Sequence, residues 1–307
     1  MGGGVMYKLK SPDVYASEIA GFLNSLLQGP DFVVNNPTSL RDISDNSFFY
    51  IDKGADLPSE LLRKHKNVLI LSSKKIDLPE NTISYIETKS PRSAFMKTVN
   101  EFYIEFDSVA IAESSTVHRQ DLLGRGVSVG EHTVIGPEVS VGNYTKVLNN
   151  VVISGRVKIG NHCLIKDNTT IGSEGFDFEC DEDGILVHGP QIGEIVIGSN
   201  VWIGANTSIE KSFVDKTIIQ DNVKIDDLVQ IGGSSSIHKN TMITAGVIVS
   251  RNVTVGENCL LSPNVSVRDS IQIGNDVTIG IGSVVVKDMP EGAVYVGNPA
   301  RLLRKNK

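Results

Sequence analysis

A few ionisable side chains in the second half of the chain are candidates for proton transfer. Asp226 and Asp227 lie a short distance before His238, and His188 lies further upstream. A carboxylate or imidazole held beside a reacting group typically contributes about 10²–10⁴-fold to a rate. The alternative for each residue is an exposed or structural side chain at a turn, and the sequence leaves both alternatives open.

The last residues of the chain are candidates for phosphate binding. A tight turn is predicted at Asn298 and Pro299, and three cations follow it, Arg301, Arg304 and Lys305. A guanidinium group binds phosphate through paired hydrogen bonds, and an ammonium group binds it as a point charge. A merely solvated cationic tail is the alternative.

Composition narrows the class of protein. Aromatic residues make up only 6 % of the 307 residues whereas glycine occurs 29 times, which favours repetitive β structure over an aromatic core. The net charge of −7 argues against a general nucleic-acid binder. No apolar run approaches the roughly 20 residues that span a bilayer, and the first residues lack the apolar region of a signal peptide. We therefore expect a cytoplasmic protein.

The three cysteines do not predict a metal site. Cys163, Cys180 and Cys259 are odd in number and widely spaced, and no C-x-x-C pair occurs. This pattern fits neither a disulfide framework nor a zinc site. We expect buried structural thiols and no bound metal.

An aliphatic residue recurs every six residues from position 111 to position 285. The repeat positions are Ile111, Val117, Leu123, Val129, Ile135, Val141, Val147, Ile153, Ile159, Ile165, Ile171, then Ile197, Ile203, Ile209, then Ile219, Ile225, Ile231, Ile237, Ile243, Val249, Val255, Leu261, Val267, Ile273, Ile279 and Val285. A period of six fits neither a helix nor a plain strand. It fits a triangular solenoid in which each short side supplies one inward aliphatic side chain, and stacked coils then share a continuous core. The sequence predicts a mainly β protein with a left-handed parallel β-helix over residues 108–290.

Two features of the repeat lead to further expectations. Glycine often follows the aliphatic position, which suggests a corner that needs a tight turn or a positive φ. The repeat is interrupted at 174–194 and at 210–217. Insertions in a solenoid become loops on one face, often the binding face. We expect a loop at the first interruption and a local bulge at the second.

Residues 1–107 lack the six-residue period and predict a small α/β domain. Ser11 and Pro12 favour the start of a helix that ends at Gly29. Residues 47–52, 68–73 and 82–87 are typical of strands, and a second helix is predicted over 91–103. No glycine-rich phosphate loop is present in this domain.

The order of these motifs resembles one enzyme family along nearly the whole chain. After the front domain with SLRDISDNSFFY come hexapeptide coils, then IGSEGFDFECDEDG, HGPQIGEIVIGSNVWIGANTSIE and DDLVQIG. This order is similar to that of the UDP-3-O-acylglucosamine N-acyltransferases of lipid A synthesis. The resemblance implies a front domain that holds the uracil of a UDP-sugar, and a trimeric solenoid with active sites between subunits.

The resemblance also implies roles for individual residues. Asp226 and Asp227 occupy the family's acidic position, and His238 is the nearest candidate base. Gly175 and Phe176 match the loop that lines the donor or acyl channel, and His188 lies in the same loop. The alternative for Phe176 is a packing role. The alternative for His188 is a structural role.

Three positions depart from the family's pattern. The family's catalytic histidine belongs to a segment like IDNxVQIAHN, and Gly233 of IDDLVQIGGSS stands in its place. A second family histidine falls near Ser270. Of the two rings that stack on uracil, Phe48 or Phe49 matches the first, whereas the second falls at Gly54 or Ala55. We assign nucleotide binding to Phe49 and Tyr50, and we expect chemistry that differs from the family's.

The C-terminal segment, 291–307, resembles a different group. GSVVVKDMPEGAVYVGNPARLLRKNK is similar to the ending of hexapeptide acetyltransferases that use coenzyme A. The resemblance implies that acyl-coenzyme A, with acetyl as the favoured acyl group, contacts Asn298, Pro299 and the three cations after them. Trp202, in VWIGAN, is added as a residue at a cofactor or subunit surface.

The leading hypothesis is an N-acyltransferase that uses acyl-coenzyme A to modify the amine of a nucleotide-linked amino sugar, in surface polysaccharide or glycan synthesis. A second hypothesis is a lipid A acyltransferase paralogue that uses acyl carrier protein. The third belongs to another class and is a catalytically inactive structural or regulatory trimer. All three imply a homotrimer.

Overall fold

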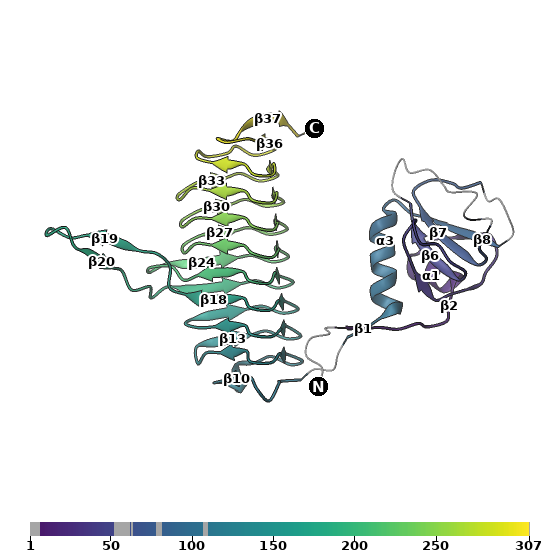
Figure 1. The fold of residues 1–307 in the computed structure, drawn as a ribbon, viewed down its shortest axis with the longest axis horizontal. Helices are drawn as coiled ribbons and strands as arrows, with labels where there is room; N and C mark the ends of the chain where they lie inside the picture. The colour runs from purple at the N-terminus through teal and green to yellow at the C-terminus, as the bar shows by residue number, and fades with distance from the viewer. Residues whose placement is uncertain (1–6, 52–61, 63, 78–81, 107–109, 307) are drawn as a thin grey trace. The chain divides into compact units, whose positions relative to one another are not determined.

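The computed structural model describes residues 7–51, 62, 64–77, 82–106 and 110–306. The chain forms two compact units, one made of Val5–Ser108 and the other containing Val109–Lys307 (Figure 1). Within the described residues, no helix is long and apolar enough to cross a membrane.

The N-terminal unit is built on a five-stranded sheet in the order β3-β8-β7-β6-β5. Its strands are β3 (Leu27–Gln28), β5 (Asn36–Pro37), β6 (Ser47–Tyr50), β7 (Val68–Ser72) and β8 (Ile83–Glu87). Strands β5 to β8 run parallel, and β3 pairs antiparallel with β8 at the edge. Successive side chains of a strand face opposite sides, so Phe48 and Phe49 belong to two separate apolar clusters. The three strands predicted from sequence are confirmed.

Both helices predicted from the sequence of this unit are found, and the first differs in length from the prediction. The second, α3 (Pro91–Thr98), begins after Ser90 and continues as a π-helix, η1 (Val99–Tyr103), as predicted. The first, α1 (Ala16–Phe22), is much shorter than the helix predicted to begin at Ser11 and Pro12 and to end at Gly29. Its flanking residues are strands instead, because β2 (Val14–Tyr15) pairs with β4 (Val33–Val34) and β3 pairs with β8. Tertiary strand pairing overrides the local helical pattern here. A further antiparallel pair joins β1 (Tyr7–Leu9) to β9 (Ile104–Phe106).

The second unit is a left-handed parallel β-helix, as predicted, with three sheets that the chain visits in turn. Face 1 consists of β10 (Thr116–Val117), β12 (Val134–Ile135), β15 (Val152–Ile153), β18 (Thr170–Ser173), β23 (Ser208–Glu210), β26 (Gln230–Ile231), β29 (Ile248–Val249), β32 (Ser266–Val267) and β35 (Val284–Val285). Face 2 consists of β13 (Val139–Val141), β16 (Val157–Ile159), β21 (Glu194–Ile197), β24 (Lys216–Ile219), β27 (Ser236–Ile237), β30 (Thr254–Val255) and β33 (Gln272–Ile273).

Face 3 completes the triangle and includes the end of the chain. It consists of β11 (Ser128–Val129), β14 (Lys146–Val147), β17 (Leu164–Ile165), β22 (Trp202–Ile203), β25 (Lys224–Ile225), β28 (Met242–Ile243), β31 (Leu260–Leu261), β34 (Thr278–Ile279), β36 (Ala293–Val296) and β37 (Arg301–Lys305). Strand β37 folds back antiparallel onto β36. A short 3₁₀ turn, η2 (Gln120–Leu122), belongs to the first coils.

The core of the β-helix consists of the predicted aliphatic positions. From Val129 to Val285 each repeat position is buried, whereas Ile111, Val117 and Leu123 of the first coils are partly exposed. Each pairs with its equivalent one coil later, as Val129 does with Val147 and Val147 with Ile165. The six-residue period is therefore the period of one side of the triangle.

The corners use glycine differently from the prediction. Positive φ falls three residues after the aliphatic position, most often on asparagine, as in Asn150, Asn168 and Asn240. Asparagine is one of the few residues besides glycine that tolerates this conformation. The glycine directly after the aliphatic residue is needed for close approach instead. A Cβ on Gly142 would lie 2.5 Å from the carbonyl carbon of Gly160 in the next coil.

Both interruptions of the repeat leave the solenoid between face 1 and face 2. The longer one forms a hairpin of β19 (Phe178–Cys180) and β20 (Leu186–His188), which projects from the side of the solenoid in Figure 1. The shorter one is a loop of residues 211–215 between β23 and β24, where the sequence predicts a local bulge. The prediction for the cysteines was wrong in part, because Cys180 lies exposed on the hairpin while Cys163 and Cys259 are buried.

We predict that Gly142→Ala destabilises the β-helix by about 1–3 kcal/mol, the usual cost of forcing extra volume into a packed site. The added methyl group would meet the backbone of the next coil, which has no flexible end that can move away. Urea unfolding followed by circular dichroism measures the change. Ser140→Ala, on the outward side of the same strand, is the matched control. An unchanged midpoint for Gly142→Ala would contradict the close-approach role.

Candidate functional site

The two interruptions of the repeat enclose a cavity at the corner between face 1 and face 2. The cavity has a volume of about 520 Å³. Its lining comes from the base of the hairpin, from the shorter loop and from the coils below them. The lining includes Phe176, Asp177, Gln191, Glu210, Lys211, Gln230, Gly233, Arg251 and Asp269.

Glu210 is a half-buried carboxylate in the wall of this cavity, at the end of β23. Its Oε1 accepts a hydrogen bond from Nε2 of Gln230 at 2.9 Å. A Cβ on Gly175 would lie 2.7 Å from Oε2 and 2.8 Å from Nε2 of Gln191, so glycine gives both side chains room here. Burial raises the pKa of Glu210 above its ordinary value, and the hydrogen bonds from Gln230 and from the backbone of Gly233 offset part of that rise. Sequence reasoning missed this residue, because it lies at the border of the shorter interruption.

A second carboxylate fixes the hairpin to the solenoid. Oε1 of Glu174 lies 2.7 Å from Nζ of Lys211, and its Oε2 accepts the N–H of Gln191 at 2.9 Å. The hydrogen bond from Lys211 lowers the pKa of Glu174, and the one from Gln191 adds to this. The N–H of Gly175 donates to Oε1 of Gln191 at 2.6 Å. An ion pair between Arg251 and Asp177, 2.8 Å apart, ties the hairpin to a coil further along.

Gly233, the position aligned with the family's histidine, lines the same cavity and is buried. A Cβ at this position would lie 2.2 Å from the backbone oxygen of Lys211. Real Cβ atoms do not approach backbone that closely, so no side chain fits while the shorter loop keeps its path. Ser270, the position of the second family histidine, is exposed and accepts a hydrogen bond from Asn252.

The three residues predicted to be catalytic lie apart from this cavity, at two different corners of the solenoid. Asp226 and Asp227 follow β25 at the corner between face 3 and face 1, and His238 follows β27 at the corner between face 2 and face 3. Asp227 pairs with Nζ of Lys166 at 2.6 Å and accepts the N–H of Ala205. The hydrogen bond from Lys166 lowers the pKa of Asp227. These contacts are the structural alternative that the sequence left open.

The predicted residues of the longer interruption divide between the cavity and the hairpin. The backbone of Gly175 lies beside Glu210, and Phe176 lines the cavity with 86 % of its surface exposed. His188 is exposed on β20, with its ring centroid 5.0 Å from that of Phe178. Phe176 is therefore not a core anchor.

The residues predicted to bind the cofactor lie on face 3. Trp202 is 40 % exposed, between Leu164 and Lys224 of the adjacent coils. After the turn at Asn298 and Pro299, where the peptide bond is cis, β37 runs along the last coil. Three exposed cations lie on it, Arg301, Arg304 and Lys305. Among the residues that the structure describes, none of these cations forms an ion pair, and no cluster suited to a metal ion is found.

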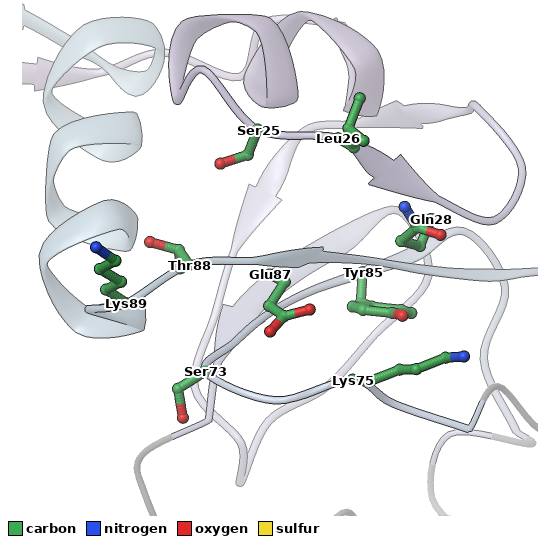
Figure 2. Close-up of a pocket in the computed structure, with 9 residues that line it drawn as sticks. All are labelled: Ser25, Leu26, Gln28, Ser73, Lys75, Tyr85, Glu87, Thr88 and Lys89. Carbon is green, nitrogen blue, oxygen red and sulfur yellow. The ribbon is translucent and has the colours of Figure 1, made fainter.

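The N-terminal unit contains a separate pocket of about 530 Å³ (Figure 2). Ser73 and Lys75 line it after β7, and Glu87 and Lys89 line it at the end of β8 and after it. Tyr85 is 96 % removed from solvent in β8, being 4 % exposed, and its hydroxyl has no hydrogen-bond partner among the described residues. Ligands of parallel α/β sheets bind beyond the carboxyl ends of the strands, which is where this pocket lies.

The aromatic residues predicted to stack on a base do not line that pocket. Phe49 is fully buried in one of the two apolar clusters and presents no face to a ligand. Tyr50 is partly exposed, with its ring centroid 5.3 Å from that of Phe95. Gly54 and Ala55 lie outside the described residues.

Comparisons with known proteins agree with the repeat. Residues 138–173 match the family described as "Bacterial transferase hexapeptide (six repeats)". The chain is similar to two proteins named UDP-3-O-acylglucosamine N-acyltransferase. That of Aromatoleum aromaticum is 45 % identical over 62 residues, and that of Saccharophagus degradans is 52 % identical over 62 residues. Each alignment covers 20 % of this chain and 18 % of the relative, so the chain spans less than a fifth of the relatives it matches.

Solved structures share the fold. The UDP-N-acetylglucosamine acyltransferase of Campylobacter jejuni matches with a TM-score of 0.57 and 17 % identity, over 64 % of this chain and 75 % of its own. That of Bacteroides fragilis matches with a TM-score of 0.56 and 22 % identity, over 64 % and 75 %. The predicted fold class and the predicted resemblance to hexapeptide-repeat acyltransferases are confirmed.

We predict that Glu210→Gln raises the thermal stability at pH 7. The folded-state pKa of Glu210 is raised, so its contribution to stability is present below the unfolded pKa of about 4.3 and is lost as the pH rises through the folded pKa. A neutral amide avoids this loss. Thermal unfolding should show a higher Tm than wild type at pH 7 and a similar Tm at pH 4. Glu113→Gln, in an exposed turn of the first coils, is the control. A lower Tm for Glu210→Gln at pH 7 would contradict the burial argument.

Proposed function

We propose that this protein is an acyltransferase, and more specifically an N-acyltransferase that uses acyl-coenzyme A to modify the amine of a nucleotide-linked amino sugar. The observation on which this rests most is the cavity at the corner between face 1 and face 2. It is built by both interruptions of a hexapeptide solenoid, beside the position aligned with the family's catalytic histidine. Surface polysaccharide or glycan synthesis is the setting that such a substrate implies.

The pocket of the N-terminal unit suits the nucleotide. Lys75 and Lys89 supply positive charge for phosphate groups. Glu87 follows the pattern of an acidic residue at the end of a parallel strand, which in dinucleotide folds accepts hydrogen bonds from ribose hydroxyls. The hydroxyl of Tyr85 lies in the same pocket and is free to bond the ligand. Tyr50 stays a candidate for contact with the base, whereas Phe49 does not.

The acyl donor is assigned to face 3 and to the C-terminal strand. The unpaired cations Arg301 and Arg304 suit the phosphates of coenzyme A, with Trp202 as an exposed apolar contact further along the same face. We expect a homotrimer, because flat solenoid faces pack side by side into a closed ring. In such a ring a partner's face 3 completes the donor path to the cavity.

The reaction follows from thioester chemistry. A neutral amine attacks the carbonyl carbon, a tetrahedral oxyanion forms, and the thiolate leaves as the amide is made. The protein must align the two substrates, supply hydrogen-bond donors to the oxyanion and dispose of one proton. The residue that would take this proton in the family, a histidine, is replaced here by Gly233.

A thiol-release assay tests the proposal. Acetyl-coenzyme A, long-chain acyl carrier protein and a panel of UDP- and dTDP-linked amino sugars are incubated with the full chain. We expect thiol release with acyl-coenzyme A and at least one of these sugars. Release with acyl carrier protein alone would instead support the lipid A paralogue, which the names of the relatives favour. No release with any pair would support the inactive trimer, which the glycine at position 233 favours.

A binding measurement tests the nucleotide pocket. Calorimetry with UDP and dTDP should show binding of at least one to the wild type. Lys75→Ala should weaken it about tenfold to a hundredfold, because one charge-assisted contact contributes roughly 1.5–3 kcal/mol and about 1.4 kcal/mol is tenfold in affinity. Tyr85→Phe, which keeps the ring, should weaken it less. Lys158→Ala, an exposed residue of face 2 outside this unit, is the charge-matched control. Equal affinity for wild type and Lys75→Ala would place the nucleotide elsewhere.

A further inference from the structure

We propose that the carboxylate of Glu210 accepts the proton of the attacking amine and so replaces the missing histidine. This inference rests on the proposed function and adds a catalytic residue that neither the sequence pattern nor the relatives indicate. It depends on three observations. No side chain fits at position 233, Glu210 accepts a hydrogen bond from Gln230 in the wall of the cavity, and the other charged groups of the cavity are paired or lie at its edge.

A histidine cannot be restored at position 233 by a single substitution. The backbone oxygen of Lys211 occupies the space where a side chain at position 233 would begin. Lys211 directly follows Glu210, so the same turn that closes the old position brings a carboxylate to its edge. The backbone of Gly233 donates a hydrogen bond to that carboxylate. The proposed base, Glu210, therefore lies next to the position of the missing histidine.

The two oxygens of Glu210 have different surroundings. Oε1 accepts the hydrogen bond from Nε2 of Gln230 at 2.9 Å. Oε2 points toward the backbone of Gly175, where any larger residue would collide with it. Gly175 belongs to the base of the hairpin, so the longer interruption forms the wall beside this oxygen. A carboxylate has lone pairs for more hydrogen bonds than the two from Gln230 and Gly233, so Oε2 is able to accept a proton.

The other charged groups of the cavity are already neutralised or lie at its edge. Lys211 pairs with Glu174, and Arg251 pairs with Asp177. Asp269 is exposed at the rim. Glu210 is held by neutral donors alone among the described residues, and burial raises the pKa of its carboxyl above the ordinary value, which makes the carboxylate a stronger base. It is the carboxylate of this cavity whose surroundings favour proton transfer.

The proposed step balances as follows. The amine nitrogen forms a bond to the carbonyl carbon of the thioester, and Oε2 of Glu210 takes one N–H proton from the positively charged nitrogen. The C–S bond then breaks, and the thiolate leaves with the electron pair. Glu210 returns the proton to the sulfur, so the products are an amide and a free thiol.

Glu210→Gln tests the assignment with acetyl-coenzyme A and the amino sugar that gives the fastest thiol release with wild type. We expect kcat to fall about 10²-fold or more, with both KM values within about threefold. The wild-type rate should rise with pH as Glu210 loses its proton, and this rise should disappear in the variant. Glu210→Asp should restore part of the rate. Gln230→Leu removes a hydrogen bond that favours the charged carboxylate and should move the rise in rate to higher pH.

Controls separate this assignment from the proposed function. Glu113→Gln should keep the wild-type rate and pH profile, and unchanged circular dichroism of Glu210→Gln excludes misfolding. An active wild type with a Glu210→Gln variant within threefold of it overturns the assignment and leaves the proposed function standing. If His238→Gln loses the rate and Glu210→Gln keeps it, the assignment is also overturned, and His238 becomes the general base. A wild type that releases no thiol with any probe overturns both.

Discussion

The pairing of each coil with the next at a fixed register is the constraint on which the rest of the second unit depends. Equivalent contacts between adjacent coils span 18 residues where the repeat is regular. They span 38 residues across the longer interruption and 22 across the shorter one. The aliphatic positions keep their register in all three cases, because a slip would expose the aliphatic core, and the register shift in β18 comes only after Ile171. Extra residues therefore have to leave the solenoid at a corner.

This constraint explains where the candidate site lies. Both insertions leave at the corner between face 1 and face 2, one directly above the other in consecutive coils. They enclose a cavity there, and the backbone of Lys211 lies against Gly233. The insertions therefore leave no room for a histidine side chain at position 233, and they place Glu210 beside that position. The corners with His238 and with Asp226 have no insertion and keep the regular turn. In this solenoid the candidate site lies where the repeat is interrupted, whereas the regular coils supply the continuous aliphatic core.

The sequence predicted the solenoid well, because a strict period is a property of the chain alone. It could not predict the role of glycine at the corners, since the close approach to the next coil is a contact between residues far apart in sequence. The first helix was overestimated because β2 and β3 find partners elsewhere in the fold. For the site, the alignment located the corner through Gly233 but pointed to His238 and the two aspartates, which lie at other corners. Glu210 has no motif of its own, and only its burial and its bond to Gln230 identify it.

The position of coenzyme A is the most direct test of the central claim that the corner between face 1 and face 2 is the catalytic site. A crystal structure of the full chain with coenzyme A and a nucleotide-linked amino sugar would give that position. We predict that the thiol sulfur enters the cavity of Phe176 and Glu210, within hydrogen-bonding reach of the sugar amine. A thiol bound at the corner of His238 or of Asp226, with the cavity beside Glu210 empty of both substrates, would contradict the account.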